Sequence, residues 1–399
     1  MKTLLLRGAR VVLPRGVAED ACVLVAGGRI EKIFDGDDAK NAGDAQTVNL
    51  SGLTLFPGLI DVHIHGARGF DTMEASAGDL LTVARFLTTQ GVTAWLPTLV
   101  PAPVEDYRRA LSAIAQLMRE QEDERATAAT ARVLGVHYEG PFVNEAQCGA
   151  LRTPYFRTYS TPADLDALPT LDAPHARHMI TLAPEISGGV ELVRELKSRG
   201  WIVSIGHTRA DVQVLERACA AGARHMTHFL NAMSPLHHRA PGPVGWGLMR
   251  DDVTCDIIAD GVHSDPLMIG LVVRCKGASR VTLISDAVAP AGLGDGEYQV
   301  WNETITVTEG RTSNARGHIA GSVSMMRDGV RMLRSLGLPA HEIARMTAHN
   351  PARLLGLEDI CGSIEEGNRA DIVAMDDEGR VRLTLVGGRI AFDEKDVTG

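Results

Sequence analysis

The stretch PGLIDVHIHGARGFD, from Pro57 to Asp71, is an apolar run that ends in two histidines one residue apart, His63 and His65. Side chains alternate between the two faces of a β-strand, so residues two apart point to the same side. If this run is a buried strand, both imidazoles face one region. The stretch therefore raises the question of which fold, and which chemistry, would use a pair of histidines at that place.

Similar apolar runs alternate with amphipathic helical runs from residue 55 to about residue 357. This alternation is typical of a parallel sheet built from strand–helix units. The eight strands that we expect are residues 59–65, 93–99, 132–139, 179–185, 202–208, 225–230, 254–260 and 281–287. The helices expected between them include residues 78–90, 190–200, 212–223, 266–277 and 323–337. Eight such units predict an α/β fold of the (β/α)8 TIM-barrel type.

Both ends of the chain read instead as short strands separated by Gly and Asp. The stretch AGGRI, Ala26 to Ile30, is echoed by VGGRI, Val386 to Ile390. We expect the two ends to pair into one small β-sandwich domain; the alternative is that the echo arises by chance. The predicted organisation is therefore a barrel over residues 57–357 and a β domain made of residues 1–56 and 358–399.

Composition and charge exclude several classes of protein. The chain has 399 residues and is 45% hydrophobic, which is enough for a barrel of about 250 residues with an appendage. Its formal net charge of -10 repels nucleic acids and anionic membrane surfaces. No stretch approaches the roughly 18 apolar residues of a membrane span, and the six cysteines form no CxxC pair. We expect a cytoplasmic protein that binds neither nucleic acid nor membrane.

Polar residues gather where the expected strands end, which is where barrel enzymes place their catalytic groups. The six residues at or near strand ends are His63, His65, Glu139, His207, His228 and Asp286. Imidazole and carboxylate ligands together suit zinc, iron or manganese. Six ligands are too many for one tetrahedral ion, whereas two ions roughly 3.5 to 4 Å apart would use them all.

The six candidate ligands are divided between the two ions. We assign His63, His65 and Asp286 to one ion and His207 and His228 to the other, with Glu139 between the two. Any one of these histidines alone would be read as an ordinary polar residue, and only their joint placement favours metal binding.

Other histidines lack such a placement. His137 and His225 lie inside expected strands, two and three residues before a candidate ligand, and we interpret both as structural. Five more fall in expected helices or loops: His175, His178, His318, His341 and His349.

Nine motifs in order resemble a known family over nearly the whole chain. They are PGLIDVHIHG, GVTAWLPTL, HYEGPFVN, LAPE, IGHT, THFLNAMSPLHHRAPG, ADGVHSD, LISDAVAPAG and TAHNPARLLGL. This set is similar to the amidohydrolase superfamily, and within it to the N-acetylglucosamine-6-phosphate deacetylase family. Many superfamily members bridge two metals with a carboxylated lysine on strand four. The expected fourth strand here, MITLAPE, has no lysine, and Glu139 takes that place, as in the deacetylase branch.

The resemblance implies an enzyme that removes the acetyl group of N-acetylglucosamine-6-phosphate to give glucosamine-6-phosphate and acetate. It implies one or two divalent metal ions per chain, with zinc favoured and iron, manganese or cobalt as alternatives. Some deacetylases have lost the HxH pair and use one metal, whereas this chain keeps both histidines. A metal-bound hydroxide would attack the acetamide carbonyl. Asp286 would take the proton of the water and return it to the departing amine, unless it serves as a metal ligand alone.

Four residues are implied as contacts for the amino sugar phosphate. Asn231 and Ala232 would offer hydrogen-bond donors, and His263 would contact the bound sugar phosphate. Arg239 would reach across from a neighbouring subunit, because a guanidinium can bond a phosphate bidentately. This role implies a homodimer; the alternative is that Arg239 is a solvated loop residue.

One departure from the family leaves the sugar open. After EGPF the family usually has Gly-Ala-His, whereas this chain has Gly149, Ala150 and Leu151. N-acetylgalactosamine-6-phosphate is therefore an alternative substrate. A cyclic-amide hydrolase of the same superfamily is a further rival, against which the missing lysine counts. A non-catalytic relative is another, against which the retention of all six candidate ligands counts.

Overall fold

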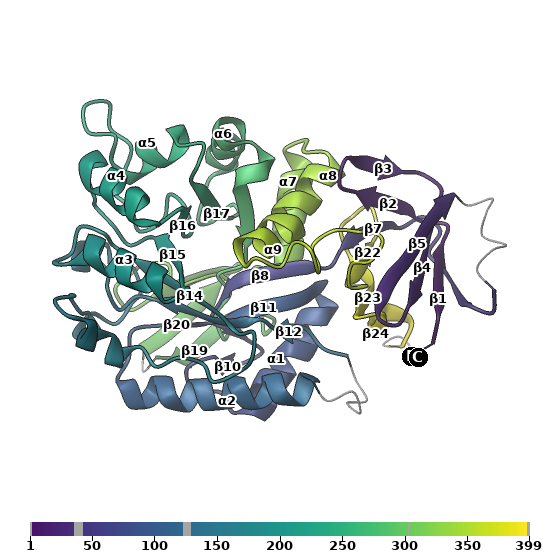
Figure 1. The fold of residues 1–399 in the computed structure, drawn as a ribbon, viewed down its shortest axis with the longest axis horizontal. Helices are drawn as coiled ribbons and strands as arrows, with labels where there is room; N and C mark the ends of the chain where they lie inside the picture. The colour runs from purple at the N-terminus through teal and green to yellow at the C-terminus, as the bar shows by residue number, and fades with distance from the viewer. Residues whose placement is uncertain (1, 36–42, 123–128, 302, 397–399) are drawn as a thin grey trace.

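A parallel β-barrel surrounded by helices forms the centre of the computed structural model, which describes residues 2–35, 43–122, 129–301 and 303–396 (Figure 1). Its strands follow one another in parallel around the barrel in the order of the chain. They are β8 (Leu59–Ile64), β11 (Val92–Leu99), β13 (Gly135–Glu139), β14 (Arg177–Leu182), β15 (Ile202–Ile205), β16 (His225–Met226), β17 (Thr254–Ile258) and β18 (Val281–Ile284). A short strand, β12 (Arg132–Val133), also pairs with β11. The (β/α)8 prediction is confirmed.

The first and last strands of the barrel meet through backbone hydrogen bonds at the level of the candidate ligands. The Asp286 N–H donates to the His63 carbonyl at 2.9 Å, and the His65 N–H donates to the Ala287 carbonyl at 2.7 Å. A β-bridge between Ile64 and Ala287 adds to this closure. Barrel closure therefore fixes the two histidines of β8 beside Asp286.

Nine α-helices cover the barrel or follow it within the described residues. They are α1 (Ala77–Thr89), α2 (Val104–Glu122), α3 (Gly189–Ser198), α4 (Val212–Ala221), α5 (Gly242–Met249), α6 (Pro266–Lys276), α7 (Met326–Ser335), α8 (Ala340–Ala344) and α9 (Asn350–Leu354). The Ser76 side chain accepts from the Asp79 N–H and Asp79 accepts from the Ser76 N–H, so a capping box starts α1. Gly222, with φ of 116°, ends α4. No helix in the described ranges is both long enough and apolar enough to cross a membrane.

Six of the eight barrel strands end earlier than the sequence indicates: β8, β14, β15, β16, β17 and β18. β15 stops two residues before His207, β16 two residues before His228, and β18 two residues before Asp286. The expectation that His207 and Asp286 end their strands was therefore wrong by two positions. The φ angles of the three residues are 48°, 31° and 50°. Extended backbone cannot continue through this left-handed conformation, which is uncommon for residues other than glycine. The chain therefore turns sharply where each of these side chains enters the barrel mouth.

The two ends of the chain form two sheets that share a second core. One sheet has the order β5-β4-β1-β6 and the other the order β24-β23-β22-β7-β2-β3. Their strands are β1 (Leu4–Arg7), β2 (Arg10–Leu13), β3 (Gly16–Ala18), β4 (Ala21–Ala26), β5 (Arg29–Asp35), β6 (Gln46–Asn49), β7 (Thr54–Pro57), β22 (Ile372–Met375), β23 (Val381–Val386) and β24 (Arg389–Asp393). Leu6, Val23, Leu55 and Ile372 are buried together between them.

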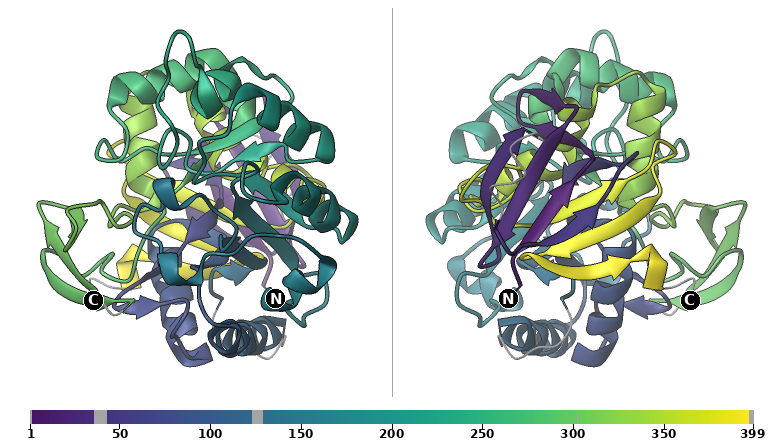
Figure 2. Two further views of the ribbon diagram at one scale, coloured as in Figure 1. Left: turned by 90° about the vertical axis from the view of Figure 1, so that its left-hand side faces the viewer. Right: turned by 90° about the vertical axis from the view of Figure 1, so that its right-hand side faces the viewer.

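N-terminal and C-terminal strands lie side by side in this β domain, as the purple and yellow arrows of Figure 2 show. β7 pairs antiparallel with β22, with Phe56 opposite Val373. The two Gly-Gly turns also meet, because the Ala370 N–H donates to the Gly28 carbonyl at 2.9 Å and the Gly388 N–H donates to the Ala370 carbonyl at 2.8 Å. The prediction that the ends pair into one small β domain is confirmed. The exact boundaries at residues 57 and 357 stay a prediction.

Two further sheets were not expected from the sequence. β9 (Gly66–Ala67) pairs with β10 (Phe70–Asp71) just after β8. An antiparallel sheet of β19 (Gly296–Val300), β20 (Glu303–Thr308) and β21 (Arg311–Asn314) lies between β18 and α7 in the chain. Figure 2 shows its light-green strands standing out from the side of the barrel. This inserted sheet contributes to the site described next.

Candidate metal centre

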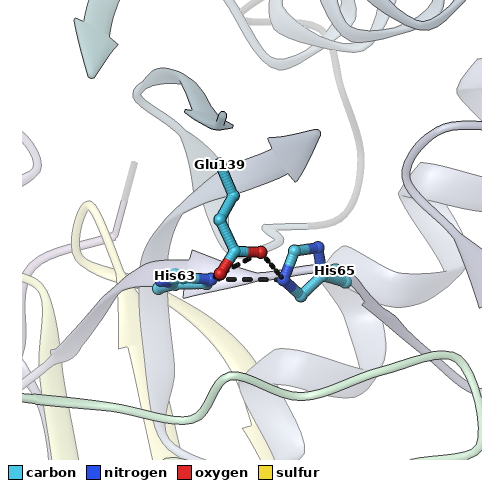
Figure 3. A group of neighbouring side chains, drawn as sticks. All are labelled: His63, His65 and Glu139. Carbon is cyan, nitrogen blue, oxygen red and sulfur yellow. Dashed lines mark hydrogen bonds and ion pairs between the residues drawn. The ribbon is translucent and has the colours of Figure 1, made fainter. Parts of the chain in front are cut away.

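His63 and His65 meet Glu139 at the barrel mouth (Figure 3), and Asp286 lies beside both histidines. The Nε2 atoms of the two histidines lie 3.2 Å apart. Glu139 Oε2 lies 3.2 Å from the His65 Nε2 and 3.7 Å from the His63 Nε2. Asp286 Oδ1 lies 3.3 Å from both ring nitrogens. Two imidazoles and two carboxylates thus surround one small volume, which we call the first cluster.

His207 and His228 meet the other oxygen of the same glutamate. Glu139 Oε1 lies 2.8 Å from the His207 Nε2 and 2.9 Å from the His228 Nε2, and these two nitrogens lie 3.1 Å apart. We call this the second cluster. Because Glu139 presents Oε2 to the first cluster and Oε1 to the second, its carboxylate is placed as a bridging ligand would be. The structure thus brings all six candidate ligands together.

The donor atoms of both clusters fit a divalent metal. The ligand atoms of His63, His65 and Glu139 lie within 4.8 Å of one another, and so do those of Glu139, His207 and His228. Pairs of ring nitrogens that face each other at 3.1 to 3.2 Å need a shared cation or proton between them. Nitrogen and oxygen donors of this kind are those that zinc, iron and manganese accept.

The electrostatics of the clusters favour positive charge at this place. Burial lowers the pKa of His65, but hydrogen bonds to Asp286 and Glu139 outweigh it and raise that pKa to about 10. Burial also opposes protonation of His228, whose hydrogen bond to Glu139 raises its pKa to about 9. Burial raises the pKa of Glu139, yet the surrounding imidazoles hold it well below its ordinary value. The two carboxylates therefore stabilise a cation in an otherwise buried site.

Two buried aspartates hold the backbone around the ligands, and the sequence interpretation did not include them. Asp256, on β17, accepts a hydrogen bond from the backbone N–H of His228, where φ is 31°. Asp61, on β8, accepts from the hydroxyl of Ser285, the residue before Asp286. Burial raises the pKa of Asp61 to about 6. The signal was present in the sequence, since each is an acidic residue within an apolar strand.

His137 and His225 make hydrogen bonds away from the clusters. His137 Nε2 lies 2.8 Å from the Thr181 Oγ1, and burial lowers the pKa of His137 well below its ordinary value. The two ring nitrogens of His225 lie 2.7 Å from the Thr254 Oγ1 and 3.0 Å from the Asp256 Oδ2. These contacts agree with the structural interpretation of both residues.

An open cavity of about 300 Å³ lies above the clusters and is lined by five of the six candidate ligands. This size is in the range of roughly 300 to 1,000 Å³ that small-molecule sites occupy. Three of the four predicted substrate contacts, Asn231, Ala232 and His263, also line it. Arg239 is exposed, and its Nη1 lies 2.9 Å from the Nε2 of its neighbour His238. Among the described residues of a single chain, those that line the cavity do not include Arg239.

His263 is held in a fixed orientation. Its Nδ1 lies 2.8 Å from the Asp260 Oδ2, and the Asp260 Oδ1 accepts the backbone N–H of His263 at 2.8 Å. Burial raises the pKa of Asp260, but the hydrogen bond and charge of His263 hold it below its ordinary value. With Nδ1 engaged by the carboxylate, the His263 Nε2 is the ring nitrogen left for a ligand in the cavity.

Several cavity residues were missed by the sequence analysis. Trp301, on the inserted sheet, and His318, just beyond it, both line the cavity. His318 Nδ1 lies 3.2 Å from the Gly149 carbonyl oxygen, beside Leu151, which is 3% exposed in the cavity wall. The strands of the insertion are largely polar and follow the last barrel strand. A tryptophan among polar residues was the one available signal.

The chain is similar to known deacetylases along its whole length. It is 35% identical to the N-acetylglucosamine-6-phosphate deacetylase of Bacillus subtilis, over 99% of this chain and 98% of that protein. It is 34% identical to the N-acetylgalactosamine-6-phosphate deacetylase of Escherichia coli, over 98% of this chain and 99% of that protein.

A solved structure agrees with both likenesses. This is a mutant N-acetyl-D-glucosamine-6-phosphate deacetylase from Mycobacterium smegmatis in complex with N-acetyl-D-glucosamine-6-phosphate. It superposes with a TM-score of 0.87 at 29% identity, covering 98% of this chain and 100% of that chain. The model of the amidohydrolase family, whose members depend on metals, matches residues 54–391. The chain therefore belongs to the amidohydrolase family.

Proposed function

We propose that this chain is a metal-dependent amide hydrolase that removes the acetyl group of N-acetylglucosamine-6-phosphate, giving glucosamine-6-phosphate and acetate. The observation that carries the proposal is the pair of clusters joined by Glu139 at the base of a cavity. The N-acetylglucosamine-6-phosphate deacetylase of Bacillus subtilis, similar over 99% of this chain, supports the choice of substrate.

Six residues would hold the metal. In this proposal His63, His65 and Asp286 bind one divalent ion, His207 and His228 bind a second, and Glu139 bridges the two. Zinc is favoured, with iron, manganese or cobalt as alternatives, because this ligand set accepts each of them. When bound, such an ion acidifies a water molecule to a pKa of about 7 and polarises the carbonyl of the substrate amide.

Asp286 carries the proton in this scheme. Its carboxylate lines the cavity beside the first cluster. Burial raises the pKa of Asp286, but the charge of His63 and the hydrogen bond with His65 hold it below its ordinary value. It is therefore a carboxylate at neutral pH, able to accept the proton of the attacking water. Returning that proton to the nitrogen of the departing amine completes the reaction.

We propose that the phosphate of the substrate binds at the side of the cavity formed by residues that follow β16 and β17. Asn231 and Ala232 come three and four residues after His228 of the second cluster, and they line the cavity together with His263. Because the protein carries a net charge of -10, a dianionic phosphate needs local cationic or amide donors. We propose that Arg239 of a neighbouring subunit supplies the guanidinium.

The surface around Arg239 supports a homodimer. Leu236 in the same loop is 53% exposed, Met249 at the end of α5 is 80% exposed, and Leu267 near the start of α6 is 84% exposed. Exposed large apolar side chains are the kind of residue that surfaces binding another protein gather. We propose that a second copy covers this face and supplies its Arg239 to the cavity.

N-acetylgalactosamine-6-phosphate remains a second candidate substrate. Leu151 stands where the family usually has a histidine that lines the sugar pocket, so one polar contact to the sugar is absent at that position. One curated relative with 34% identity is an N-acetylgalactosamine-6-phosphate deacetylase. His318 lines the same cavity as Leu151, and its Nδ1 lies 3.2 Å from the Gly149 carbonyl oxygen, so its imidazole is a candidate for a polar contact to the sugar.

Acetate release from a panel of N-acetylated hexosamines tests the proposal. The panel pairs N-acetylglucosamine and N-acetylgalactosamine with their 6-phosphates. We expect release from N-acetylglucosamine-6-phosphate with the highest kcat/KM, and little release from the unphosphorylated sugars. Preference for the galactosamine compound would establish the second candidate. No acetate from any of the four, with metal supplied, would contradict the proposed function.

A further inference from the structure

Trp301 is a large aromatic residue at a turn between two strands. It follows directly on β19, and β20 begins at Glu303. Such turns are normally exposed and made of small polar residues, yet Trp301 is only 8% exposed. Its ring packs edge-to-face against His65, with ring centroids 5.5 Å apart. The turn of the inserted sheet therefore reaches into the candidate metal centre.

The backbone of Trp301 is strained. Its φ is 55°, in the left-handed region that glycine, asparagine and aspartate normally occupy at such turns. For a bulky residue this conformation is a genuine outlier. It persists where the surrounding contacts determine the position of the residue, and such outliers are common at ligand clamps. The presence of tryptophan at this position is therefore better explained by the contact of its side chain in the cavity than by the conformation that the turn requires.

The geometry of the proposed substrate indicates a role for the contact between Trp301 and His65. In a hexosamine 6-phosphate, the phosphate on C6 and the acyl group on C2 lie on opposite sides of the sugar ring. The proposed phosphate contacts Asn231 and Ala232 come three and four residues after His228 of the second cluster and line the cavity with it. Trp301 packs on His65 of the first cluster. A sugar held by its phosphate, with its amide carbonyl between the clusters, directs its acyl chain toward Trp301.

We propose that Trp301 forms the acyl end of the cavity and limits the acyl group that the enzyme removes to about the size of acetyl. The inference rests on the proposed function, and it assigns a specificity-determining residue to that reaction. N-acetyl sugars fit beside the indole, whereas a longer acyl chain meets the ring. Because the ring is buried against His65, a propanoyl or butanoyl group has to displace it.

The test compares N-acetyl-, N-propanoyl- and N-butanoyl-glucosamine-6-phosphate as substrates of the wild-type enzyme and of Trp301→Gly. Glycine suits the observed φ, so this variant removes the side chain without burdening the turn. One methylene in an apolar pocket changes kcat/KM by roughly 10- to 200-fold. We expect the wild type to prefer acetyl over butanoyl by at least about tenfold, and Trp301→Gly to lower that preference by at least about tenfold. Trp301→Phe should fall between the two.

Tyr298→Ala is the matched control. Tyr298 is on β19, the strand that precedes Trp301, and its hydroxyl donates to the Gly294 carbonyl at 3.0 Å; the described residues that line the cavity do not include it. Its acyl preference should equal that of the wild type. If Trp301→Gly and Trp301→Phe both keep the wild-type preference, or if the wild type does not discriminate, the role of Trp301 is overturned while the proposed function stands. If the wild type cleaves none of the three sugars, the proposed function fails and the inference falls with it.

Discussion

The acidic residues of the barrel mouth and those of the β domain pair with different basic side chains. Glu139 and Asp286 face imidazoles, whose positive charge depends on a bound proton or a nearby metal. Asp376, at the end of β22, faces two guanidiniums, with Arg380 Nε at 2.8 Å and Arg382 Nη2 at 2.7 Å. A guanidinium is charged at every ordinary pH. The β domain thus completes its own charge balance, whereas the barrel mouth requires a cation.

The backbones of the two regions also differ in the conformational strain that they carry. At the mouth, the left-handed φ angles belong to His207, His228 and Asp286, for which they are unfavourable. In the β domain, Gly27 and Gly387 adopt left-handed angles at the hairpin turns, at little cost. Strain at functional sites is commonly held in place by the rest of the fold. The mouth is therefore built for ligands and the β domain for stability.

Metal removal should have the largest effect on the barrel mouth and little effect on the β domain. Chelation should abolish acetate release, because the clusters then lack the cation that their carboxylates stabilise, and adding metal back should restore it. Elemental analysis of the purified protein should find between one and two transition-metal ions per chain. The β domain needs no cation, so circular dichroism should show that the secondary structure survives chelation. A metal-free protein with full activity would rule out the metal centre.

Asp286→Asn should give the next largest effect. Loss of general acid–base help costs about 100- to 10,000-fold in rate, so turnover should fall by at least about 100-fold. Asparagine tolerates left-handed backbone, so the observed φ of 50° should be kept and the melting temperature should change little. Steady-state kinetics and metal analysis of the same preparation check both points. Near-normal turnover with metal bound would show that Asp286 is not the proton carrier.

The sequence sufficed to predict the barrel and the meeting of six residues because both follow from strand periodicity. Each candidate ligand lies at or near an apolar run, and parallel strands bring their carboxyl ends to one mouth. The alternation rule applies to His63 and His65, which β8 holds in place. It does not apply to His207, His228 and Asp286, since their left-handed backbone is imposed by contacts from elsewhere, such as the bond from the His228 N–H to Asp256.

The remaining parts of the site depend on tertiary contacts that no local pattern contains. Trp301 reaches the cavity through tertiary contacts such as its packing on His65, and the strand periodicity of the inserted sheet carries no information about where it packs. His318 likewise falls in a loop that became part of the cavity wall. Leu151 was noticed only because it departs from a family motif. Insertions between barrel elements are therefore where sequence reasoning fails first.

Arg239→Ala should have a smaller effect than Asp286→Asn, and it tests whether Arg239 contributes a phosphate contact to a barrel mouth shared by two subunits. Hydrogen bonds to charged groups contribute about 1.5 to 3 kcal/mol, so kcat/KM for the phosphorylated sugar should fall by about ten- to a hundredfold. The loss should be absent for an unphosphorylated sugar. Competition between the two substrates measures both effects in one preparation, and an equal loss for both sugars would contradict a phosphate contact.

Mixing two variants tests whether Arg239 acts across subunits. In a dimer of one Arg239→Ala chain and one Asp286→Asn chain, one site holds both lesions and the other holds neither. Random exchange makes half of the dimers mixed, so about a quarter of the wild-type activity should return. If exchange is demonstrated and activity does not return, Arg239 serves its own subunit or none.

Asp376→Asn should have the smallest effect, and it should act on stability alone. Burial raises the pKa of Asp376, but hydrogen bonds from Arg380 and Arg382 hold it well below its ordinary value. Arg380 is 54% exposed, so solvent screening reduces the gain, and the free energy of unfolding should fall by about 1 to 2 kcal/mol at pH 7. Activity should be unchanged, because the described residues that line the cavity do not include Asp376.

The dependence of this loss on pH separates charge from packing. Because the pKa of Asp376 is lowered on folding, its carboxylate stabilises the fold above the unfolded pKa of about 4, and this contribution disappears as the pH falls toward the folded value. Urea denaturation at pH 7 and at the lowest pH where the wild type is folded should therefore show a shrinking difference between wild type and variant. Asp251→Asn, at a side chain that is 82% exposed, is the control and should lose less than about 0.5 kcal/mol at either pH. A difference that stays constant with pH would mean that Asp376 stabilises the β domain through its shape and hydrogen bonds, and that the contrast in charge between the two regions does not extend to stability.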